Sequence, residues 1–301
     1  MSLLIVGTVA FDGIETPFGK VDRILGGSAT YIGISASYFN KTCNLVSVVG
    51  GDFDNENIEL LKKHSINCDG LKLVPNQKTF FWSGKYHKNM NKRDTIETQL
   101  NVLETFTPII PEKYQNCSYL MLANLMPSIQ LEAIANLNQK PTLIITDTMN
   151  YWMDNCLSDL ISVISKTDVL IINDEEAFQL SGEKNINNAA KKIQKMGPLF
   201  LIIKRGEYGA VLFSNNRVFS CPSFSVKKCI DPTGAGDTFA GAFIGHLTST
   251  RDNSFENMTH AVIRACAMAS FCVEGFGVNG LLNVGKETLT KRIETLTKII
   301  S

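Results

Sequence analysis

Residues 231–243 read Asp231-Pro-Thr-Gly-Ala-Gly-Asp-Thr-Phe-Ala-Gly-Ala-Phe243, a glycine-rich turn followed by small and apolar residues. Gly234 and Gly236 allow the backbone to turn tightly, and the residues after them are typical of a buried helix. A helix N-terminus offers unpaired N–H groups and the positive end of the helix dipole, which together bind anions. The stretch therefore predicts a phosphate-binding turn at the start of a helix.

Asp237 falls in the first turn of this predicted helix, where its negative charge would repel a bound phosphate. One interpretation is a catalytic base that takes a proton from a hydroxyl group as it attacks phosphorus. The other is an acidic residue that only stabilises its own helix N-terminus. For an isolated Gly-x-Gly-Asp the second interpretation is favoured, so the rest of the chain has to decide.

The composition is that of a soluble globular protein of 301 residues, with 44% hydrophobic and 19% charged residues. Lys plus Arg and Asp plus Glu balance at 29 each, which argues against nucleic acid or an anionic membrane as a partner. The N-terminus has no signal-peptide pattern, and no apolar run is long enough to span a membrane. Eight cysteines without a C-x-x-C pair indicate buried thiols in a reducing compartment, so we expect a cytoplasmic protein.

Short apolar runs alternate with helical patterns along most of the chain, and the helices predicted near its end cover 237–249, 256–274 and 286–300. This alternation predicts an α/β fold with a doubly wound, mostly parallel sheet and helices on both faces. The predicted strands lie around Leu3–Val6, 45–49, 119–123, 142–146, 169–172 and 199–203. Antiparallel strands are expected at 211–213, 217–219 and 223–230.

Residues 14–25 and 71–104 differ from this pattern, because aromatic and polar residues are mixed there. We interpret them as hairpins or a small sheet, so the chain is expected to form one domain, 1–301, with a β-lid from roughly 12–25 and 71–104. A solvated hairpin surface explains the basic residues of the lid better than contacts to an anionic substrate. These residues are Lys85, His87, Lys88, Lys92 and Arg93. Pairing of an exposed lid with that of a second copy would hide its edge, which predicts a homodimer.

Other phosphate-binding and metal motifs are missing from the sequence. There is no G-x-x-x-x-G-K-[ST], which excludes a P-loop kinase. Gly234-Ala-Gly-Asp-Thr-Phe239 lacks the last glycine of G-x-G-x-x-G, which disfavours a dinucleotide-binding dehydrogenase. No H-E-x-x-H or paired Cys/His spacing points to zinc.

The chain resembles the PfkB, or ribokinase-like, family of carbohydrate and nucleoside kinases in five landmarks that occur in the family's order. Asp231-Pro-Thr-Gly-Ala-Gly-Asp237 is similar to the D-T-x-G-A-G-D signature of that family. Asp12 follows the first strand, and Gly26-Gly27 opens the first helix. Asn173-Asp-Glu-Glu176 is similar to the N-x-x-E motif, and Gly206-Glu-Tyr-Gly209 to the G-x-x-G nucleotide loop. Helix capping at Asp237 explains none of the other four landmarks, so the catalytic interpretation is now favoured.

The resemblance implies a three-layer α/β/α fold with a β-lid and an ATP-dependent phosphotransferase. Asp237 would deprotonate the hydroxyl group of the acceptor. The N–H groups of Gly234, Ala235 and Gly236 would form the anion hole for the transferring γ-phosphoryl group. The cofactors implied are ATP and Mg²⁺.

The other landmarks carry binding roles by the same resemblance. Asn173 and Glu176 would act near Mg²⁺ and the ATP phosphates, Glu176 through water. Lys204, Gly206 and Gly209 would line the nucleotide. Asp12, Gly26 and Gly27 would hold substrate hydroxyl groups. Some members bind a monovalent cation such as K⁺ beside the residue that matches Asp231.

Three departures from the family pattern bear on the substrate. Tyr31 stands where an Asn is usual, Lys204 where a Thr is usual, and Asn124 where ribokinases have a Glu before a Pro. We therefore expect a small sugar other than ribose as the acceptor, with Tyr31 and Asn124 among the substrate-binding residues. A nucleoside is the alternative, because Phe11, Tyr31 and Trp82 could stack on a base, although core packing is the commoner use of such residues. A kinase for a phosphorylated sugar would rest on the basic residues of the lid alone, and a catalytically silent ligand-binding protein would have no need for Asp237.

Overall fold

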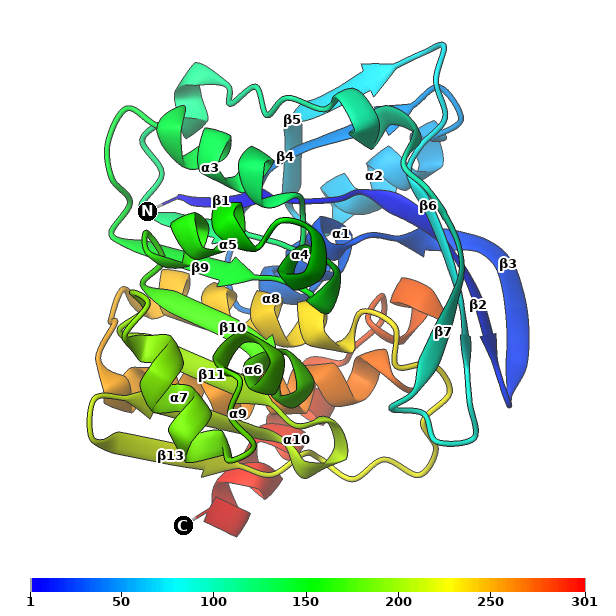
Figure 1. The fold of residues 1–301 in the computed structure, drawn as a ribbon. Helices are drawn as coiled ribbons and strands as arrows, with labels where there is room; N and C mark the ends of the chain where they lie inside the picture. Colours follow the sequence, from blue (N-terminus) through cyan, green and yellow to red (C-terminus); the bar gives the residue numbers. More distant parts are fainter. Residues whose placement is uncertain (1, 301) are drawn as a thin grey trace.

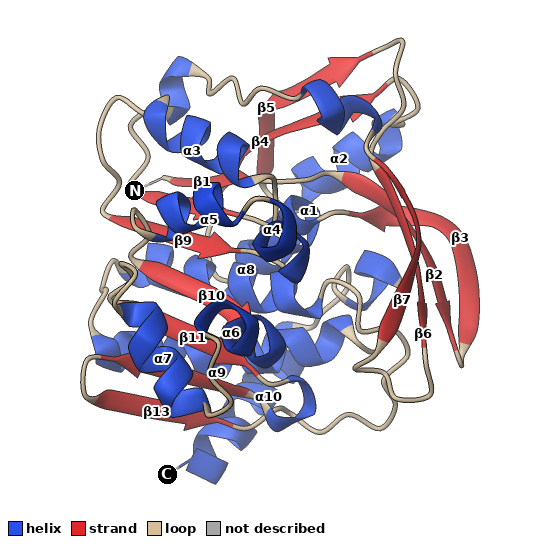
Figure 2. Cartoon of the chain, viewed as in Figure 1, coloured by secondary structure: helices blue, strands red, loops and turns tan. Residues whose placement is uncertain are grey.

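A computed structural model describes residues 2–300 of the chain and contains one large and one small β-sheet (Figure 1, Figure 2). The large sheet has nine strands in the order β13-β12-β11-β10-β9-β8-β1-β4-β5. The seven strands from β11 to β5 in this order are parallel, and β12 and β13 are antiparallel at one edge. The predicted doubly wound, mostly parallel sheet is confirmed. Within residues 2–300, no helix has the length and apolar character needed to cross a membrane.

The strands of the large sheet read as continuous apolar runs because both of their faces are covered. Leu3 and Ile5 point into one hydrophobic core, and Leu4 and Val6, which alternate with them, point into another. The strands are β1 Leu3–Val6, β4 Cys43–Gly50, β5 Ile66–Val74, β8 Tyr119–Leu122, β9 Leu143–Asp147, β10 Val169–Asn173, β11 Phe200–Lys204, β12 Ala210–Ser214 and β13 Arg217–Cys221. The segment 223–230, which we expected to be extended, contains no strand.

Two helical layers cover the sheet, which completes the three-layer arrangement (Figure 1). One layer consists of α1 Ser28–Ser37, α2 Asn55–Lys63, α8 Ala235–Thr250, α9 Phe255–Cys272 and α10 Lys286–Ile300. The other consists of α3 Pro127–Ala135, α4 Asn150–Asn155, α5 Leu157–Ile164, α6 Asp174–Ser181 and α7 Ile186–Gln194. Short 3₁₀ helices occur at η1 Asn101–Thr105, η2 Glu112–Tyr114, η3 Gly206–Tyr208 and η4 Gly277–Gly280.

The small residues of α8 allow it to lie very close to α1. A Cβ atom on Gly241 would come within 2.3 Å of the Ile32 carbonyl oxygen, and one on Gly245 within 2.8 Å of the Ala36 carbonyl oxygen. The Ser35 hydroxyl donates a hydrogen bond of 2.6 Å to the backbone oxygen of Thr238 across the same contact. This packing holds the N-terminus of α8, with its glycine-rich turn, beside the start of α1 (Figure 1).

The small sheet stands beside the large one and has the order β3-β2-β6-β7 (Figure 1). Its strands are β2 Ala10–Thr16, β3 Gly19–Gly26, β6 Phe81–Tyr86 and β7 Arg93–Gln99. We call these four strands the lid. Its edge strands β3 and β7 have no further strand beside them in this order, and the homodimer through the lid stays a prediction.

Two parts of the range expected for the lid lie elsewhere. Residues 71–74 are the end of β5 in the large sheet, and residues 101–105 form η1. β5 is an edge strand with many half-exposed residues, so its sequence is mixed in the same way as that of a lid strand. Asp12, the first residue of the range expected for the lid, lies within β2 of the lid.

Candidate active site

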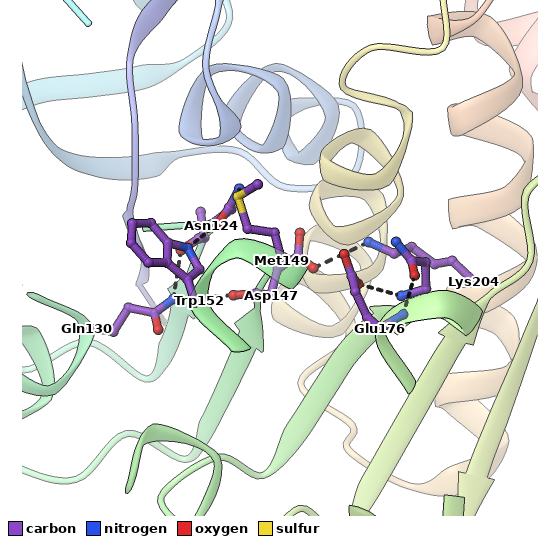
Figure 3. A network of polar contacts seen from close by, with 9 residues as sticks. Asn124, Gln130, Asp147, Met149, Trp152, Glu176 and Lys204 are labelled. Atoms are coloured by element: carbon purple, nitrogen blue, oxygen red, sulfur yellow. Dashed lines mark hydrogen bonds and ion pairs between the residues drawn. The ribbon is translucent and has the colours of Figure 1, made fainter. Parts of the chain in front are cut away.

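Polar residues end neighbouring parallel strands of the large sheet at one edge. Asp147 ends β9, Asn173 ends β10 and Lys204 ends β11, while Asn124 follows the end of β8. The register places Asn173 beside Lys204 in adjacent strands. In open α/β sheets ligands bind at the carboxyl ends of the strands, which is the edge these residues occupy (Figure 3).

The glycine-rich turn forms the N-terminus of α8. Gly234 is the N-cap residue with φ 73°, a left-handed conformation that favours glycine. A Cβ atom on Gly234 would come within 2.3 Å of the Tyr31 ring, so close packing also requires glycine there. The Ala235 amide donates to the Pro232 carbonyl at 3.2 Å, so one of the three amides predicted to bind an anion already has a partner inside the turn.

Asp237 lies in the first turn of α8 and is partly buried. Burial raises the pKa of its carboxyl group to about 7, and the charge of Asp147 adds to the rise. The cations Lys204 and Arg93 act in the opposite direction on the same pKa. A carboxyl group that titrates near neutral pH is suited to accept a proton during catalysis.

Lys204 forms an ion pair with Asp147, with 3.3 Å between Nζ and Oδ1 (Figure 3). Their side chains are 17% and 6% exposed, so Lys204 is not the surface charge that a lysine usually is. A Cβ atom on Gly236 would lie 2.9 Å from Nζ, which puts the ammonium group beside the glycine-rich turn. Burial would lower the pKa of Lys204, but Asp147, Glu176 and Asp237 outweigh it and raise that pKa.

Asn173 and Glu176 form a reciprocal capping box at the start of α6. The Asn173 side-chain oxygen accepts a hydrogen bond from the backbone N–H of Glu176, and the Glu176 carboxylate accepts one from the backbone N–H of Asn173. Both hydrogen bonds are 2.8 Å long. Burial raises the pKa of Glu176 to about 7, while the nearby Lys204 opposes the rise. The N-x-x-E motif is therefore also part of the helix cap that holds Glu176 near Lys204.

Asp12 and the Gly26-Gly27 pair meet where the lid joins α1. A Cβ atom on Gly26 would come within 2.0 Å of the Asp12 carboxylate, and the Gly27 amide donates a hydrogen bond to that carboxylate. Gly27 is the N-cap residue of α1. Burial raises the pKa of Asp12 to about 8, with further contributions from Asp231 and Asp237.

Tyr31 faces the same group of carboxylates. Burial raises the pKa of its phenol well above the usual value, and the charges of Asp12, Asp231 and Asp237 contribute. Within the part of the chain that the structure describes, the buried Tyr31 hydroxyl has no hydrogen-bond partner. A buried hydroxyl group that stays unpaired costs about 1–3 kcal/mol of stability. An unpaired group of this kind is expected where a bound ligand supplies the partner.

Asp231 is fully buried just before the turn. Its Oδ1 accepts from the Thr233 amide and its Oδ2 from the Gly277 amide, both at 2.9 Å. Burial raises its pKa, and these hydrogen bonds oppose the rise. The bonds tie the turn to η4, and a role of Asp231 beside a monovalent cation stays a prediction.

The amide group of Asn124 is held by two side chains near α4 (Figure 3). The Trp152 indole donates to Asn124 Oδ1 at 2.8 Å, and Asn124 Nδ2 lies 3.2 Å from the sulfur of Met149. The side-chain amide of Gln130 donates to the carbonyl oxygens of Ala123, next to Asn124, and of Asp147, so it connects the ends of β8 and β9. Asn124 thus lies at the edge of the sheet, but its side chain already has protein partners, and its contact with the substrate stays a prediction.

Gly206 and Gly209 follow Lys204 and frame η3 with φ 53° and φ 87°. The loop is closed by a 2.7 Å hydrogen bond from the Arg205 amide to the Gly209 carbonyl. Asn91, at the tip of the lid, lies against this loop, since a Cβ atom on Gly206 would be 3.0 Å from its Oδ1.

The structure separates the three aromatic residues considered for stacking. Tyr31 is buried against Gly234, and Phe11 packs on Phe53 with 5.5 Å between ring centroids. Trp82 pairs with Asp12 in adjacent lid strands and therefore shares the face of the lid that carries Asp12. Of the three, Trp82 is the candidate for contact with an acceptor.

Two residues near Asp237 were not assigned to the site from the sequence. Asp147 ends a predicted buried strand, and a carboxylate in that position was the signal that could have identified it. Arg93 was interpreted as part of a solvated surface, yet its charge reaches Asp12, Glu176 and Asp237. No pattern in the sequence distinguishes it from the neighbouring basic residues of the lid.

The family of the chain follows from comparison with known proteins. The profile of the pfkB family carbohydrate kinases matches residues 15–283. The chain belongs to the pfkB family. It is similar to a cytidine kinase of Thermococcus kodakarensis, with 26% identity over 83% of this chain and 90% of that protein.

Solved structures of kinases share the fold. The nucleoside kinase of Methanocaldococcus jannaschii has a TM-score of 0.78 and 21% identity, and the match covers 98% of this chain and 99% of that one. A putative ribokinase II from E. coli in complex with ATP and Mg²⁺ has a TM-score of 0.79 and 20% identity over 99% of both chains. The pfkB kinase is thus an ATP-dependent phosphotransferase with an alcohol group as acceptor.

Proposed function

We propose that this pfkB kinase transfers the γ-phosphoryl group of ATP to a hydroxyl group of a small sugar, with Asp237 as the base. The observation that carries the proposal is the position of Asp237. Its carboxyl group has a pKa raised to about 7 by burial and lies at the glycine-rich N-terminus of α8. A residue that only stabilised its helix would need neither the burial nor the neighbouring ion pair of Asp147 and Lys204.

In the proposed reaction Asp237 accepts the proton of the acceptor hydroxyl as its oxygen attacks the γ-phosphorus. The bond from that phosphorus to the bridging oxygen of ADP breaks at the same time. The transition state spreads negative charge over the phosphoryl oxygens, so fixed dipoles and cations lower its energy. The amides of Gly234 and Gly236, the N-terminus of α8 and the Lys204 ammonium group are the donors that support this assignment.

The carboxylates at the strand edge fit a magnesium ion that arrives with the nucleotide. Among residues 2–300 no group of three or more His, Cys, Asp or Glu side chains forms a metal cage. Mg²⁺ is usually held by one or two carboxylates, waters and substrate phosphates, so a cage is not required. Glu176 would hold it through water, and Asn173 would fix the position of Glu176. The ion would neutralise charge that develops on the phosphates.

On the acceptor side, Asp12 and the unpaired Tyr31 hydroxyl are proposed to bind substrate hydroxyl groups. Asp12 accepts from the Gly27 amide and lies beside Gly26, which has no side chain to collide with it. A sugar hydroxyl can donate to a carboxylate and accept from a phenol, which would give the buried Tyr31 hydroxyl a partner.

A nucleoside is the second candidate for the acceptor. The cytidine kinase and nucleoside kinases among the relatives favour it, and so does Trp82 on the inner face of the lid. An aromatic side chain in that place could stack on a base, while the ribose would occupy the position proposed for the sugar.

The test is a screen of the purified protein with Mg-ATP against free sugars and nucleosides, with ADP release measured and the phosphorylated product identified. We expect turnover with a subset of the free sugars. Turnover restricted to nucleosides would transfer the proposal to the second candidate. Tight binding of one compound without ADP release from any would contradict both and support a silent binding protein.

A further inference from the structure

The hairpin of β6 and β7 is held against the glycine-rich turn by its own side chains. The Tyr86 hydroxyl accepts a hydrogen bond of 3.1 Å from the hydroxyl of Thr233, the residue before Gly234. Tyr86 pairs with Arg93 in the adjacent strand, so both side chains share one face of the lid. Arg93 is therefore positioned next to the turn at the start of α8.

Two further contacts fix the position of Arg93. Its guanidinium carbon lies 5.3 Å from the centre of the Trp82 ring, and the guanidinium donates a hydrogen bond to Tyr86. At the tip of the hairpin, Asn91 lies against Gly206 of the nucleotide loop. The hairpin thus contacts both the glycine-rich turn and η3, and Arg93 lies beside Tyr86 at this end of the hairpin.

The charge of Arg93 acts on carboxylates from three different elements. It lowers the pKa of Asp12 in the lid, Glu176 in α6 and Asp237 in α8. Asp12 and Asp237 lie on the acceptor side, whereas Glu176 lies on the side proposed for the ATP phosphates. The guanidinium group thus acts on carboxylates of both the acceptor side and the side proposed for the ATP phosphates.

The donors of Arg93 are not used in an ion pair. In the described part of the chain, no carboxylate comes within the 4.0 Å of an ion pair with Arg93. By contrast, the lid residues Lys85 and His87 pair with Glu15 at 2.6 Å and Asp94 at 2.9 Å. The solvated-surface interpretation fits Lys85 and His87, but Arg93 keeps free donors for a planar, multidentate contact with an anion.

We propose that Arg93 is a catalytic residue of the lid, which contacts the transferring phosphoryl group and stabilises its charge in the transition state. The proposal rests on the proposed function. The guanidinium group neither gains nor loses a proton: the acceptor O–H gives its proton to Asp237, its oxygen bonds to phosphorus, and ADP leaves with the electron pair of the broken P–O bond. Because Arg93 comes from the lid, the anion-binding site is complete only when the lid lies on the turn.

The test compares affinities for Mg-ADP and for Mg-ADP with aluminium fluoride, a mimic of the phosphoryl group in flight, by calorimetry. In Arg93→Ala we expect affinity for the mimic to fall by about 10²-fold or more, the loss seen when one donor to a developing anion is removed. Affinity for Mg-ADP alone should stay within about threefold. Arg93→Lys keeps the charge but not the planar guanidinium fork, so its affinity for the mimic should lie between those of wild type and Arg93→Ala.

Lys20→Ala is the matched control, because Lys20 is an exposed basic residue of the same lid that pairs with Asp22 at 2.7 Å. It should leave both affinities unchanged. An equal loss of both affinities in Arg93→Ala, or no loss, would overturn the proposal. With the acceptor found in the screen, a higher KM for that acceptor at unchanged kcat would also overturn it, since Arg93 would then anchor the acceptor. If the wild-type protein does not bind the mimic more tightly than ADP, the proposed function itself has failed.

Discussion

The carboxyl edge of the large sheet and the inner face of the lid form the two sides of one site, and they are built differently. At the sheet edge, β1, β8 and β9 are buried along their whole length, and Asp147 and Lys204 are locked in an ion pair. In the lid, β7 is exposed at nearly every position. Tyr86 and Arg93 are positioned there by a few contacts to the turn and to Trp82.

This difference indicates a division of work. Segments with many buried contacts open only with global unfolding, whereas an exposed sheet held by few contacts opens at a lower free energy. Under the proposed function, the sheet edge would keep a fixed arrangement for nucleotide phosphates, and the lid would admit an acceptor and then complete the site.

The largest expected effect concerns Asp237, in the first turn of α8. Asp237→Asn should lower kcat by about 10²–10⁴-fold, the range for loss of a general base, with little change in affinity for Mg-ADP. Steady-state kinetics with the acceptor from the screen would measure it. The matched control is Glu287→Gln, which removes an exposed acidic residue from the first turn of α10 and should leave kcat unchanged. Near-normal turnover of Asp237→Asn would leave Asp237 with helix stabilisation alone.

Removal of one partner of the Asp147–Lys204 ion pair at the sheet edge should lower the free energy of unfolding. Lys204→Met leaves the buried Asp147 carboxylate without its partner, so the free energy of unfolding should fall by about 3 kcal/mol. Asp147→Asn in the same chain should recover most of that loss, which urea denaturation can measure. Lys192→Met is the control, because Lys192 and Glu183 form an exposed pair at 3.8 Å, and it should change stability by less than about 0.5 kcal/mol. If the Lys204→Met protein is as stable as wild type, the ion pair with Asp147 does not stabilise the sheet edge.

The contrast also appears in what could be predicted from the sequence. Strands buried on both faces give continuous apolar runs, so the large sheet and its helices were predictable. The glycine-rich turn, for which phosphate binding stays a prediction, is visible in the sequence because glycine at Gly234 is enforced by φ 73° and by the Tyr31 ring. Close approaches of this kind restrict a position to one residue type, and such restrictions are visible in a sequence.

The partners of individual side chains were not predictable. The Asp147–Lys204 pair joins residues 57 positions apart, at the ends of β9 and β11, which lie on either side of β10 and which only the sheet order brings together. The role of Arg93 depends on which face of an exposed strand it occupies, and an exposed strand shows no alternation of polar and apolar residues to reveal that. The boundary between β5 and the lid was missed for the same reason.

The pH dependence of kcat/KM tests whether Asp147 of the sheet edge and Arg93 of the lid both shift the pKa of Asp237. In wild type, kcat/KM should fall about tenfold per pH unit below about 7, because Asp237 must be unprotonated and its pKa is raised to about 7. Asp147→Asn removes a negative charge that raises this pKa, so the acid limb should move to lower pH. Arg93→Ala removes a positive charge that lowers it, so the limb should move to higher pH. If the acid limb of kcat/KM stays at the same pH in both variants, neither Asp147 nor Arg93 shifts the pKa of Asp237.

The smallest expected effect concerns Asn124, where the sequence predicted contact with the substrate. The structure gives its amide two protein partners, the Trp152 indole at 2.8 Å and the Met149 sulfur at 3.2 Å. If Asn124 mainly orients Trp152, then Asn124→Ala and Trp152→Phe should each lower the free energy of unfolding by about 1 kcal/mol and change the KM for the acceptor equally, by less than about fivefold. If Asn124 binds the acceptor itself, its KM should rise far more in Asn124→Ala than in Trp152→Phe. The KM for ATP should be the same in Asn124→Ala and Trp152→Phe in either case, since the two explanations differ only in how the acceptor is bound.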